Sequence, residues 1–346
     1  MKPLKKIGVV GHFAFGKDFY DGQTIKAKEL SKELERQLTS VEVVKVDTYG
    51  GIKRLPTIIF KTILLFKNCK NVIMLPAHNG VKVFAPLFCI LKKLFGRKIF
   101  YGVVGGWLPE FISNRKGLKK RLMSFDAILV ETTSMKNKLE KMGFKNIHIM
   151  PNFKALTCVA TEEIQNNEPY KLCTFSRVMK EKGIEDAVSA VKVVNDKFGR
   201  EVFKLDIYGQ IDSSQVEWFE NLKKGFPSCV RYCGVVEFNK STQVLKDYFA
   251  LLFPTKFYTE GIPGTIIDAL ASGIPVITSK WQNYADIVED KYNGLCYEFD
   301  ANNLLAELLD DIADSPSTFA DMKINCVNSA QKFMPENAIK VLLEML

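Results

Sequence analysis

The segment from Phe253 to Thr278 combines residue types that suit the binding of a phosphate-bearing ligand. Its pattern predicts a strand, a loop, a helix, a turn and a second strand. The loop holds Glu260, Gly261, Ile262, Pro263, Gly264 and Thr265. The glycines let a ligand approach the main chain closely, and a proline near the first helical turn costs no backbone hydrogen bond. Because the N–H groups of a first helical turn attract anions, this loop predicts a phosphate or diphosphate site.

Two carboxylates belong to the same segment. Glu260 stands just before the predicted helix, and Asp268 stands eight positions further on. We expect Asp268 about two turns along the helix, on roughly the same side as Glu260. A purely structural interpretation is also open, in which Glu260 caps the helix and Gly264 only makes a turn, since doubly wound folds contain many such loops.

The stretch from Glu260 to Ile277 resembles the signature of glycosyltransferase family 4 (glycosyl transferases group 1), the retaining glycosyltransferases of GT-B fold. That signature has two Glu residues separated by seven positions, then Ala and a small-Gly-x-Pro-Val turn. Here Asp268 stands in place of the second Glu, and residues 272–276 make the turn. The resemblance implies that Glu260 contacts hydroxyls of the donor sugar. It also implies a nucleotide-ribose contact for Asp268, whose side chain is one methylene shorter than Glu.

A second stretch, residues 174–183, is similar to the strand and loop with which that family holds the donor diphosphate. Arg177 and Lys182 are the matching cations. A leaving nucleoside diphosphate gains charge as the glycosidic bond breaks, and fixed cations stabilise that charge. The resemblance therefore implies catalytic roles for Glu260, Arg177 and Lys182. Standing alone, the two cations would be interpreted as ordinary surface residues.

Two glycines match further landmarks of the family. Residues 205–209 resemble a strand that ends in glycine near the nucleotide, which implies a donor contact for Gly209. Residues 13–23 resemble the family's first glycine-bearing loop, in which Gly22 opens a helix toward the diphosphate. Together the matches cover nearly the whole chain, although the first half matches mostly by topology.

The acceptor side offers weaker candidates. After the strand predicted over 98–104, many relatives carry a His, and here Gly105 stands near that position, followed by Gly106 and Trp107. His12 and His78 are the remaining imidazole candidates. A lone His after a strand is more often structural than catalytic. Trp107 suits either sugar stacking or packing.

The elements around these residues predict an α/β fold. Short apolar strands alternate with helix-period segments throughout, which indicates βαβ units, parallel sheets and right-handed crossovers. We predict a GT-B architecture of two Rossmann-like, doubly wound domains facing across a cleft. The resemblance implies that residues 1–155 form the acceptor-binding domain and 156–334 the nucleotide-sugar domain, joined by the aperiodic stretch 151–169. A short helix over 335–346 either ends the second domain or packs back on the first.

The predicted strands are residues 7–10, 41–46, 71–75, 98–104, 127–131 and 146–150 in the first domain, and 171–175, 202–208, 230–233, 250–253 and 275–278 in the second. The clearest predicted helices are 22–38 and 184–198, where apolar residues recur at intervals of three and four.

Charge is divided unevenly between the two halves. Residues 1–150 contain 28 Lys and Arg against 11 Asp and Glu, whereas residues 151–346 contain 20 against 28. Apolar runs beside cations over 56–67, 81–93 and 115–121 suit peripheral contact with an anionic membrane and a lipid-linked acceptor. The alternative is that these helices only cover a parallel sheet. Nucleic acid is a poorer partner, because no recognition motif accompanies the charge.

Other classes of protein are disfavoured. No run reaches 18 uncharged apolar residues, so no transmembrane helix is expected, and the start lacks the pattern of a secretory signal. The eight cysteines are scattered without zinc-site spacing, which favours a reduced cytoplasmic protein. The chain has no Asp-x-Asp triplet, the usual metal-diphosphate clamp of the other common glycosyltransferase fold. We therefore expect no metal ion and no cofactor. A hydrolase with paired carboxylates has no second acid that can be placed opposite Glu260.

The resemblance, together with these observations, implies a retaining hexosyltransferase. The expected reaction moves a sugar from a UDP- or GDP-sugar to a glycan acceptor. We expect this acceptor to be lipid-linked and to serve the synthesis of bacterial surface polysaccharide such as O-antigen, capsule or lipopolysaccharide. The expected location is the cytoplasm, peripherally on the inner face of the plasma membrane. Two alternatives stay open: a sugar-nucleotide epimerase of the same architecture, and a non-catalytic protein that binds a nucleotide sugar.

Overall fold

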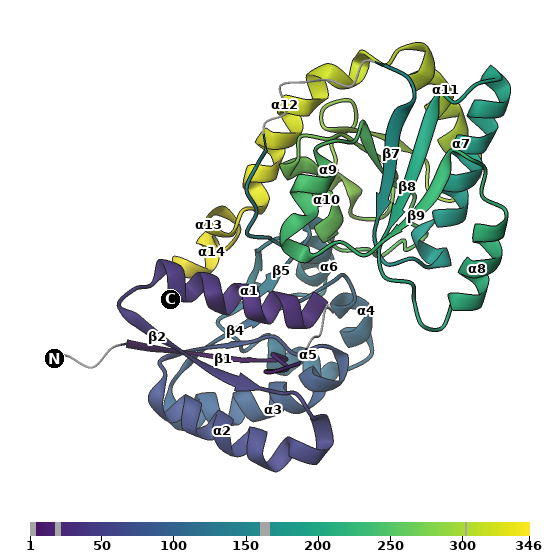
Figure 1. Cartoon of the computed structure of the whole chain (residues 1–346). Helices are drawn as coiled ribbons and strands as arrows, with labels where there is room; N and C mark the ends of the chain where they lie inside the picture. Colours follow the sequence, from purple (N-terminus) through teal and green to yellow (C-terminus); the bar gives the residue numbers. More distant parts are fainter. Residues whose placement is uncertain (1–4, 18–21, 160–166, 302) are drawn as a thin grey trace. The chain divides into compact units, whose positions relative to one another are not determined.

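The computed structural model describes residues 5–17, 22–159, 167–301 and 303–346. Parts of two segments discussed above, the loop over 13–23 and the stretch over 151–169, lie outside the described residues. The chain forms two compact units (Figure 1). The N-terminal unit comprises residues 1–155 together with 335–346, and the C-terminal unit comprises residues 156–334.

The N-terminal unit is built on a parallel sheet of six strands in the order β2-β1-β3-β4-β5-β6. The strand order reverses between β1 and β3, as it does in doubly wound sheets. Successive strand residues point to opposite faces: Val72 and Met74 enter one core, and Ile73 and Leu75 enter the other. The strands are β1 (Lys5–Gly11), β2 (Val41–Asp47), β3 (Asn71–Met74), β4 (Lys98–Gly102), β5 (Ala127–Val130) and β6 (Ile147–Ile149).

Helices cover both faces of this sheet, as a parallel sheet requires. Buried residues of α2, α3, α5 and α6 pack on one face, and those of α1, α13 and α14 pack on the other (Figure 1). The helices are α1 (Gly22–Gln37), η1 (Gly51–Arg54), α2 (Leu55–Asn68), α3 (His78–Phe95), α4 (Leu108–Ser113), α5 (Lys116–Leu122), α6 (Thr133–Lys141), α13 (Pro335–Ala338) and α14 (Lys340–Leu343).

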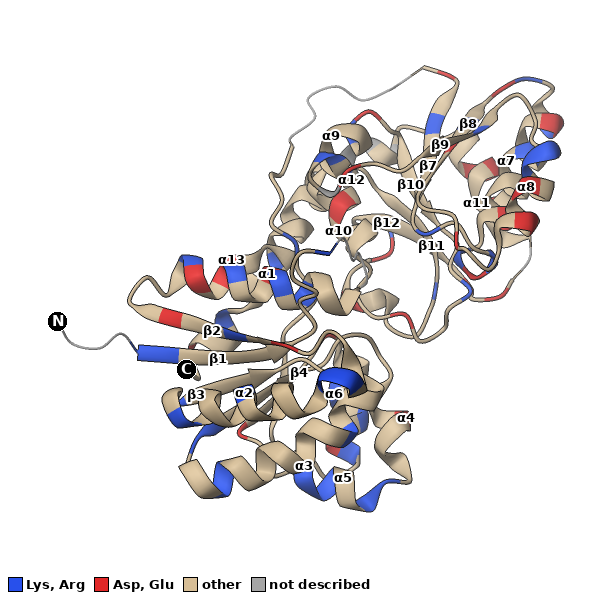
Figure 2. Ribbon diagram, turned by 60° about the horizontal axis from the view of Figure 1, so that its bottom comes forward, with Lys and Arg blue, Asp and Glu red and all other residues tan. Residues whose placement is uncertain are grey.

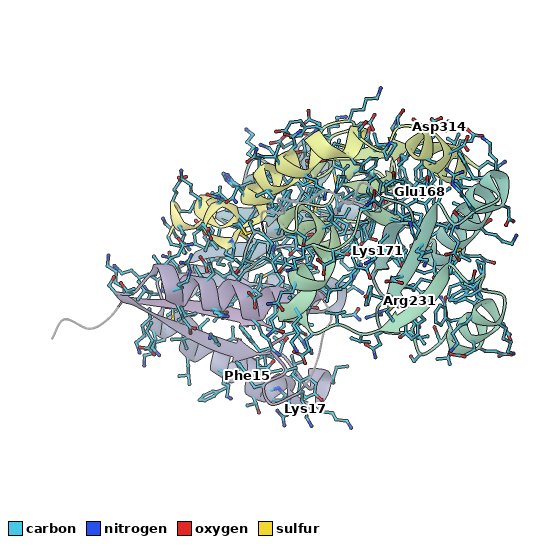
Figure 3. All side chains as sticks on the ribbon, turned by 45° about the horizontal axis from the view of Figure 1, so that its top comes forward. Phe15, Lys17, Glu168, Lys171, Arg231 and Asp314 are labelled. Carbon is cyan, nitrogen blue, oxygen red and sulfur yellow. The ribbon has the colours of Figure 1, made fainter. Side chains whose placement is uncertain are left out.

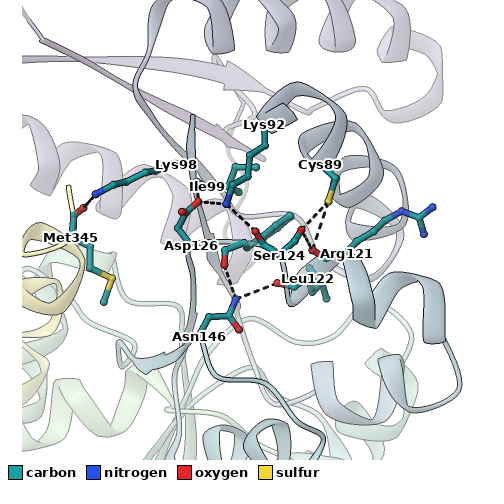
Figure 4. A network of polar contacts seen from close by, with 11 residues as sticks. Cys89, Lys92, Lys98, Ile99, Arg121, Leu122, Ser124, Asp126, Asn146 and Met345 are labelled. Atoms are coloured by element: carbon teal, nitrogen blue, oxygen red, sulfur yellow. Dashed lines mark hydrogen bonds and ion pairs between the residues drawn. The ribbon is translucent and has the colours of Figure 1, made fainter. Parts of the chain in front are cut away.

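The last twelve residues pack against the N-terminal unit. Ile339 and Leu342 are fully buried, and Lys98 donates from Nζ to the carbonyl of Met345 at 3.2 Å (Figure 4). The prediction of one helix over 335–346 was wrong. Two short helices form instead, because the backbone of Ile339 leaves helical geometry at φ −92° and ψ 0°.

A polar network fastens the helices beneath the sheet (Figure 4). Lys92 of α3 donates to the carbonyl of Ser124 at 2.8 Å and pairs with Asp126 at 2.7 Å. Asn146 donates to the carbonyl oxygens of Leu122 and Phe125. These bonds tie α3 and Asn146 to the end of α5 and to the residues that directly follow it.

The C-terminal unit repeats the architecture, with six parallel strands in the order β12-β11-β10-β7-β8-β9. Its order reverses between β10 and β7. The strands are β7 (Tyr170–Phe175), β8 (Phe203–Tyr208), β9 (Val230–Gly234), β10 (Ala250–Phe253), β11 (Val276–Ser279) and β12 (Gly294–Tyr297). The sequence prediction omitted β12, a four-residue edge strand that begins with glycine. Gly294 passes so near β11 that a Cβ there would lie 2.2 Å from the carbonyl oxygen of Val276.

Two cores fill this unit. Residues of α7, α8 and α11 contribute to the core on one face of the sheet, and residues of α9, α10 and α12 contribute to the other. The helices are η2 (Lys180–Lys182), α7 (Ile184–Phe198), α8 (Val216–Lys224), η3 (Phe238–Lys240), α9 (Ser241–Leu245), α10 (Gly264–Ala271), η4 (Tyr284–Asp286), α11 (Leu304–Asp314), α12 (Thr318–Ala330) and η5 (Gln331–Phe333).

Candidate functional site

The structure brings two of the three predicted catalytic residues together. Lys182 Nζ lies 2.5 Å from Glu260 Oε2, and the two side chains keep 15% and 21% of their surface exposed. Lys182 follows β7 and Glu260 follows β10, which are neighbours in the sheet. The pair therefore lies beyond the carboxyl ends of the two strands between which the strand order reverses. In open α/β sheets this is the usual place for a ligand.

The two loops that carry the pair are fastened to one another. Lys256 donates its backbone N–H to the carbonyl of Glu181 at 2.8 Å, and Asn283 Nδ2 donates to the carbonyl of Glu260. The Lys182 ammonium also lies 5.5 Å from the ring centre of Phe253 and 5.0 Å from that of Phe257. These hydrogen bonds and the two aromatic rings together restrict the position of the Lys182 ammonium group.

Gly183 sets the distance between these loops. Its φ is +69°, in the left-handed region that favours glycine. A Cβ at this position would lie 1.9 Å from the carbonyl oxygen of Pro254. Only glycine lets the start of α7 approach the end of β10 this closely. The sequence placed Gly183 in the lysine-bearing loop but gave no reason why glycine is needed there.

Arg177 does not join the pair. Its guanidinium is 55% exposed and lies 3.5 Å from Asp212, which follows β8. Ser214 donates hydrogen bonds from its N–H and its hydroxyl to Asp212. These bonds hold the pKa of Asp212 below its ordinary value, with a smaller contribution from Arg177. The prediction that Arg177 and Lys182 hold one diphosphate stays a prediction.

The backbone geometry at position 209 requires glycine. Its φ is +135°, and a Cβ would lie 1.8 Å from the carbonyl oxygen of Ser176. Its N–H donates to the carbonyl of Gly234 at 2.8 Å. The glycine thus allows the ends of β7, β8 and β9 to pack together at the edge where the pair lies.

The loop before α10 differs from one detail of the prediction. Pro263 is the N-cap and the helix begins at Gly264, so Glu260 lies in the loop. The expectation that Asp268 lies about two turns along the helix from Glu260 was wrong, because the three residues between Glu260 and the helix start are not helical, so Asp268 lies about one turn into α10. Asp268 is 2% exposed, and Ser241 Oγ donates to its Oδ1 at 2.9 Å. Of the remaining loop residues, Ile262 is buried, whereas Gly261 and Thr265 are half-buried.

Several polar atoms at this edge of the sheet are buried without a partner. Within the described part of the chain, no hydrogen bond reaches four such atoms of the C-terminal unit: Thr174 Oγ1, Thr265 Oγ1, Trp281 Nε1 and Asn283 Oδ1. All four lie in or just beyond the carboxyl-terminal ends of the strands, or in the first turn of α10. Buried polar groups are normally satisfied. Their concentration at this edge of the sheet favours a site for a polar ligand.

A network centred on the buried Asp206, which the sequence did not predict, lies beside Gly209. Asp206 accepts two bonds from Arg231, at 2.6 and 2.8 Å, and one from the Tyr248 hydroxyl at 2.6 Å. Tyr208 in turn bonds Tyr248 at 2.8 Å. Burial raises the pKa of Asp206, but the bonds from Arg231 and Tyr248 outweigh it, so the net pKa lies below the ordinary value. Figure 3 shows Arg231 on β9. The only signal in the sequence was an acid inside a predicted strand.

In the N-terminal unit, His12 and Gly22 lie beyond the carboxyl end of β1. His12 is half-buried and its Nδ1 lies 2.6 Å from Thr24 Oγ1. Gly22 is the exposed first residue of α1. Asp47 at the end of β2 accepts backbone N–H bonds from Phe13, Ala14, Phe15 and Tyr49. Burial raises the pKa of Asp47, but these four bonds outweigh it and the net pKa is lowered. Asp47 thereby shapes the loop after β1, a role the sequence did not indicate.

The other acceptor-side candidates form an aromatic cluster. The rings of His78 and Trp107 stack at 3.9 Å, and Phe111 meets both edge-on. Trp107 Nε1 donates to the carbonyl of Val104 at 2.8 Å, which fixes the ring. Burial and the nearby Lys82 lower the pKa of His78, so the neutral imidazole is favoured.

Gly105 and Gly106 precede Trp107 in the loop after β4. Gly105 has a φ of +77°, and its N–H donates to Glu131 Oε2 at 3.2 Å. Glu131 follows β5, is buried, and lies 3.7 Å from the equally buried Lys26 of α1. Burial lowers the pKa of Lys26, and Glu131 partly offsets that effect. This ion pair holds the loop against α1, and the sequence gave no indication of it.

No group of three or more His, Cys, Asp or Glu side chains within the described ranges could hold a metal ion. Nor does any helix among the described residues have the length and apolar character needed to cross a membrane.

Comparison with known proteins decides the family. Residues 161–332 match the family model of the glycosyl transferases group 1. The C-terminal unit belongs to this family. The family predicted from Glu260, Asp268 and their neighbours is therefore confirmed.

One curated relative and several solved structures are similar. A segment of 148 residues is 24% identical to the amylovoran biosynthesis glycosyltransferase AmsK of Erwinia amylovora, and it covers 41% of this chain and 36% of AmsK. The matched segment thus spans about a third of that relative.

The structure of Anabaena Alr3699/HepE in complex with UDP has a TM-score of 0.76 at 14% identity, over 99% of each chain. Sucrose-phosphate synthase from Thermosynechococcus elongatus has a TM-score of 0.74 at 16% identity, over 99% of this chain and 98% of that one. The lipopolysaccharide outer core galactosyltransferase WaaB has a TM-score of 0.71 at 16% identity, over 99% and 100%. These likenesses confirm the predicted GT-B fold.

Proposed function

We propose that this chain is a glycosyltransferase that moves a hexosyl group from a UDP- or GDP-sugar to a glycan acceptor, with retention of configuration and without a metal ion. The observation that carries the proposal is the Lys182–Glu260 pair. It lies where the strand order reverses in a unit that belongs to the glycosyl transferases group 1. The four buried polar atoms without a hydrogen-bond partner at the same edge of the sheet support a polar ligand there.

The pair suits the charge changes of sugar transfer. The acceptor hydroxyl oxygen forms a bond to the anomeric carbon of the donor sugar, and the bond from that carbon to the β-phosphate oxygen breaks. The proton of the hydroxyl passes to the leaving diphosphate, which departs as the nucleoside diphosphate. Lys182 then stabilises the growing negative charge of the phosphate. When the diphosphate replaces Glu260 as the partner of Lys182, the Glu260 carboxylate accepts hydrogen bonds from the sugar hydroxyls.

The first turn of α10 would supply further stabilisation. Helix N-termini carry N–H groups and a partial positive charge that favour phosphate. The buried hydroxyl of Thr265, which has no hydrogen-bond partner among the described residues, is available to the same group. Charge neutralisation by Lys182 and by this turn is the reason we propose that no metal is needed.

The relatives support the class of donor and acceptor. HepE was solved with UDP and glucose and with UDP-glucose, which favours a nucleoside diphosphate sugar here. The names of AmsK and WaaB refer to amylovoran and to the lipopolysaccharide outer core, both surface polysaccharides. We therefore propose a lipid-linked glycan of bacterial surface polysaccharide as the acceptor. In the N-terminal unit, the stacked His78 and Trp107 rings would hold an acceptor sugar.

Slow donor hydrolysis tests this proposal without knowledge of the acceptor, since water can replace the acceptor hydroxyl. The purified chain is incubated with UDP- and GDP-sugars in excess EDTA, and products are followed by proton NMR. We expect nucleoside diphosphate release from one donor, with free sugar appearing first in the donor's own anomeric configuration. Lys182→Ala should reduce the rate at least tenfold, since a charge-assisted hydrogen bond contributes about 1.5–3 kcal/mol. Lys280→Ala, which removes a lysine paired with Glu298 in the same unit, is the matched control.

Each alternative function or mechanism predicts a different result of this experiment. Conversion of the sugar nucleotide to its epimer would identify an epimerase. Binding of a donor without release of nucleoside diphosphate would favour a non-catalytic binding protein. An inverted first product would contradict retention, and a strict requirement for added divalent metal would contradict metal independence.

A further inference from the structure

Helix α2 has two apolar faces, although a surface helix normally has one. Its first face, with Ile58, Leu65 and Phe66, is buried in the core of the N-terminal unit. Its second face, with Phe60, Ile63 and Leu64, is 62%, 37% and 42% exposed. The spacing of these three residues, by three and four, places them on one side of the helix. Covering the sheet therefore accounts for the first apolar face of α2 and not for the second.

Helix α3 repeats this arrangement. Phe84, Phe88 and Leu91 enter the same core, whereas Val83, Ile90 and Leu94 are 40%, 58% and 70% exposed. The exposed residues step by seven and four, again along one side of a helix. The two helices pack against each other through Phe66 and Phe88, whose ring centres lie 4.9 Å apart.

The same layer is strongly basic. Between residues 48 and 125 the sequence has 15 Lys and Arg and a single acid, Glu110. Figure 2 shows the cations along α2, α3 and α5, with little red among them. Lys92 is engaged with Asp126, but Lys61, Lys67 and Lys93 are exposed beside the second apolar faces. The layer thus presents aliphatic and aromatic side chains within a field of positive charge.

We propose that the α2–α3 surface, defined by Phe60, Ile63, Leu64, Val83, Ile90 and Leu94 with their neighbouring lysines, binds an anionic phospholipid bilayer. Such a bilayer accepts apolar side chains at its acyl boundary and attracts cations to its headgroups. A second copy of this chain would bring two strongly positive layers together, which charge repulsion opposes. Nucleic acid would neutralise the cations but would leave the aliphatic side chains uncovered.

The surface also bears on the proposed function, although it does not depend on it. Helix α3 begins at His78, which stacks on Trp107, and continues into the exposed residues Val83, Ile90 and Leu94. A bilayer held on this surface would lie along the helix that starts at the proposed acceptor cluster. Vesicle binding can be measured without nucleotide, so its failure and the failure of the donor site are separate results.

Vesicle flotation tests the proposal with the full chain. One set of vesicles contains phosphatidylcholine alone and the other contains phosphatidylcholine mixed with phosphatidylglycerol. We expect binding to the mixed vesicles, weakened by added salt, because salt screens exposed charges. Lys61→Glu/Lys67→Glu should weaken partitioning by about 25-fold or more, since each cation near an anionic surface contributes about fivefold. Phe60→Ser/Leu64→Ser should weaken it by about tenfold or more.

Matched variants on the C-terminal unit control for charge and apolarity as such. Lys223→Glu/Lys224→Glu on α8 makes the same charge change, and Ile324→Ser on α12 removes an apolar side chain that is 68% exposed. Both controls should bind vesicles like the wild-type chain, and all variants should keep its thermal transition. Absence of binding to the mixed vesicles at low salt would overturn the proposal. So would a wild-type dimer that Phe60→Ser/Leu64→Ser dissociates, or binding of duplex DNA in place of vesicles.

Discussion

Replacing Gly183 by alanine should break the contact that sets the Lys182–Glu260 distance. At this position φ is +69°, and the new Cβ would lie 1.9 Å from the carbonyl oxygen and 2.8 Å from the carbonyl carbon of Pro254. Contacts of real Cβ atoms begin at 3.0 Å, so one backbone segment must move by about 1 Å. The backbone conformation costs an L-residue about 1–2 kcal/mol, and forced displacement in a packed region costs about 1–3 kcal/mol more.

Gly199 at the other end of α7 provides the matched control. Its φ is +65°, but a Cβ there would have no neighbour within 4 Å. Gly199→Ala should therefore lose only about 1–2 kcal/mol of unfolding free energy, whereas Gly183→Ala should lose about 2–5 kcal/mol. The difference between the two variants isolates the contact with Pro254.

Urea denaturation followed by tryptophan fluorescence measures this difference. In a Trp107→Phe background, the two remaining tryptophans, Trp218 and Trp281, both report on the C-terminal unit. In the wild-type background, Gly183→Ala should also slow donor hydrolysis by about 100-fold, because a displacement of about 1 Å of a catalytic group has that order of effect. Equal stability of the two variants, or unchanged hydrolysis in Gly183→Ala, would refute the reasoning.

Three further predictions concern other parts of the molecule. The pKa of Asp206 in the folded protein lies below its ordinary value of 3.8, so the Asp206 carboxylate should stabilise the fold fully above pH 3.8 and lose this effect as the pH falls through the folded-state pKa. The difference in unfolding free energy between wild-type and Asp206→Asn should therefore narrow on acidification. A difference that does not change with pH would contradict this prediction. Trp107→Ala should raise the KM for the acceptor while donor affinity stays unchanged, and weakened donor binding measured by calorimetry would count against an acceptor role. Excess EDTA should leave nucleotide affinity unchanged, whereas an affinity restored only by added magnesium or manganese would show that the diphosphate needs a metal.

The sequence was most informative where the spacing of apolar residues and the positions of glycines indicate the same element. Helix α7 was predicted over 184–198 and forms over Ile184–Phe198, since its apolar residues step by three and four between two glycines. The edge strand β12 was missed although β10, which is equally short, was predicted; Gly294–Tyr297 begins with glycine, which is depleted in strands. The break in the C-terminal helix falls at Ile339, which is buried in the N-terminal unit, and no glycine or proline marks it in the sequence.

The sequence predicted which residues belong to the donor site, but it did not predict which of them contact one another. The motif placed Glu260 and Lys182 in one function, but they are 78 positions apart. Their pairing depends on β10 lying beside β7, which is a property of strand order. The same limit applies to Asp206 and Arg231, where an acid within a strand is satisfied by a cation from the neighbouring strand. Periodicity likewise indicated that α2 is apolar, but burial was needed to separate its core face from its exposed face.

Titration calorimetry of nucleoside diphosphates tests the central claim most directly, namely that Lys182 and Glu260 form a donor-diphosphate site. UDP, GDP and CDP are titrated into the wild-type chain, Lys182→Ala and the control Lys280→Ala, all in EDTA. We predict that one nucleotide binds the wild-type and Lys280→Ala chains equally, and that Lys182→Ala weakens this binding by about 10- to 150-fold, equivalent to about 1.5–3 kcal/mol. Equal affinity in all three proteins, or no binding of any nucleotide to folded wild-type protein, would contradict the account.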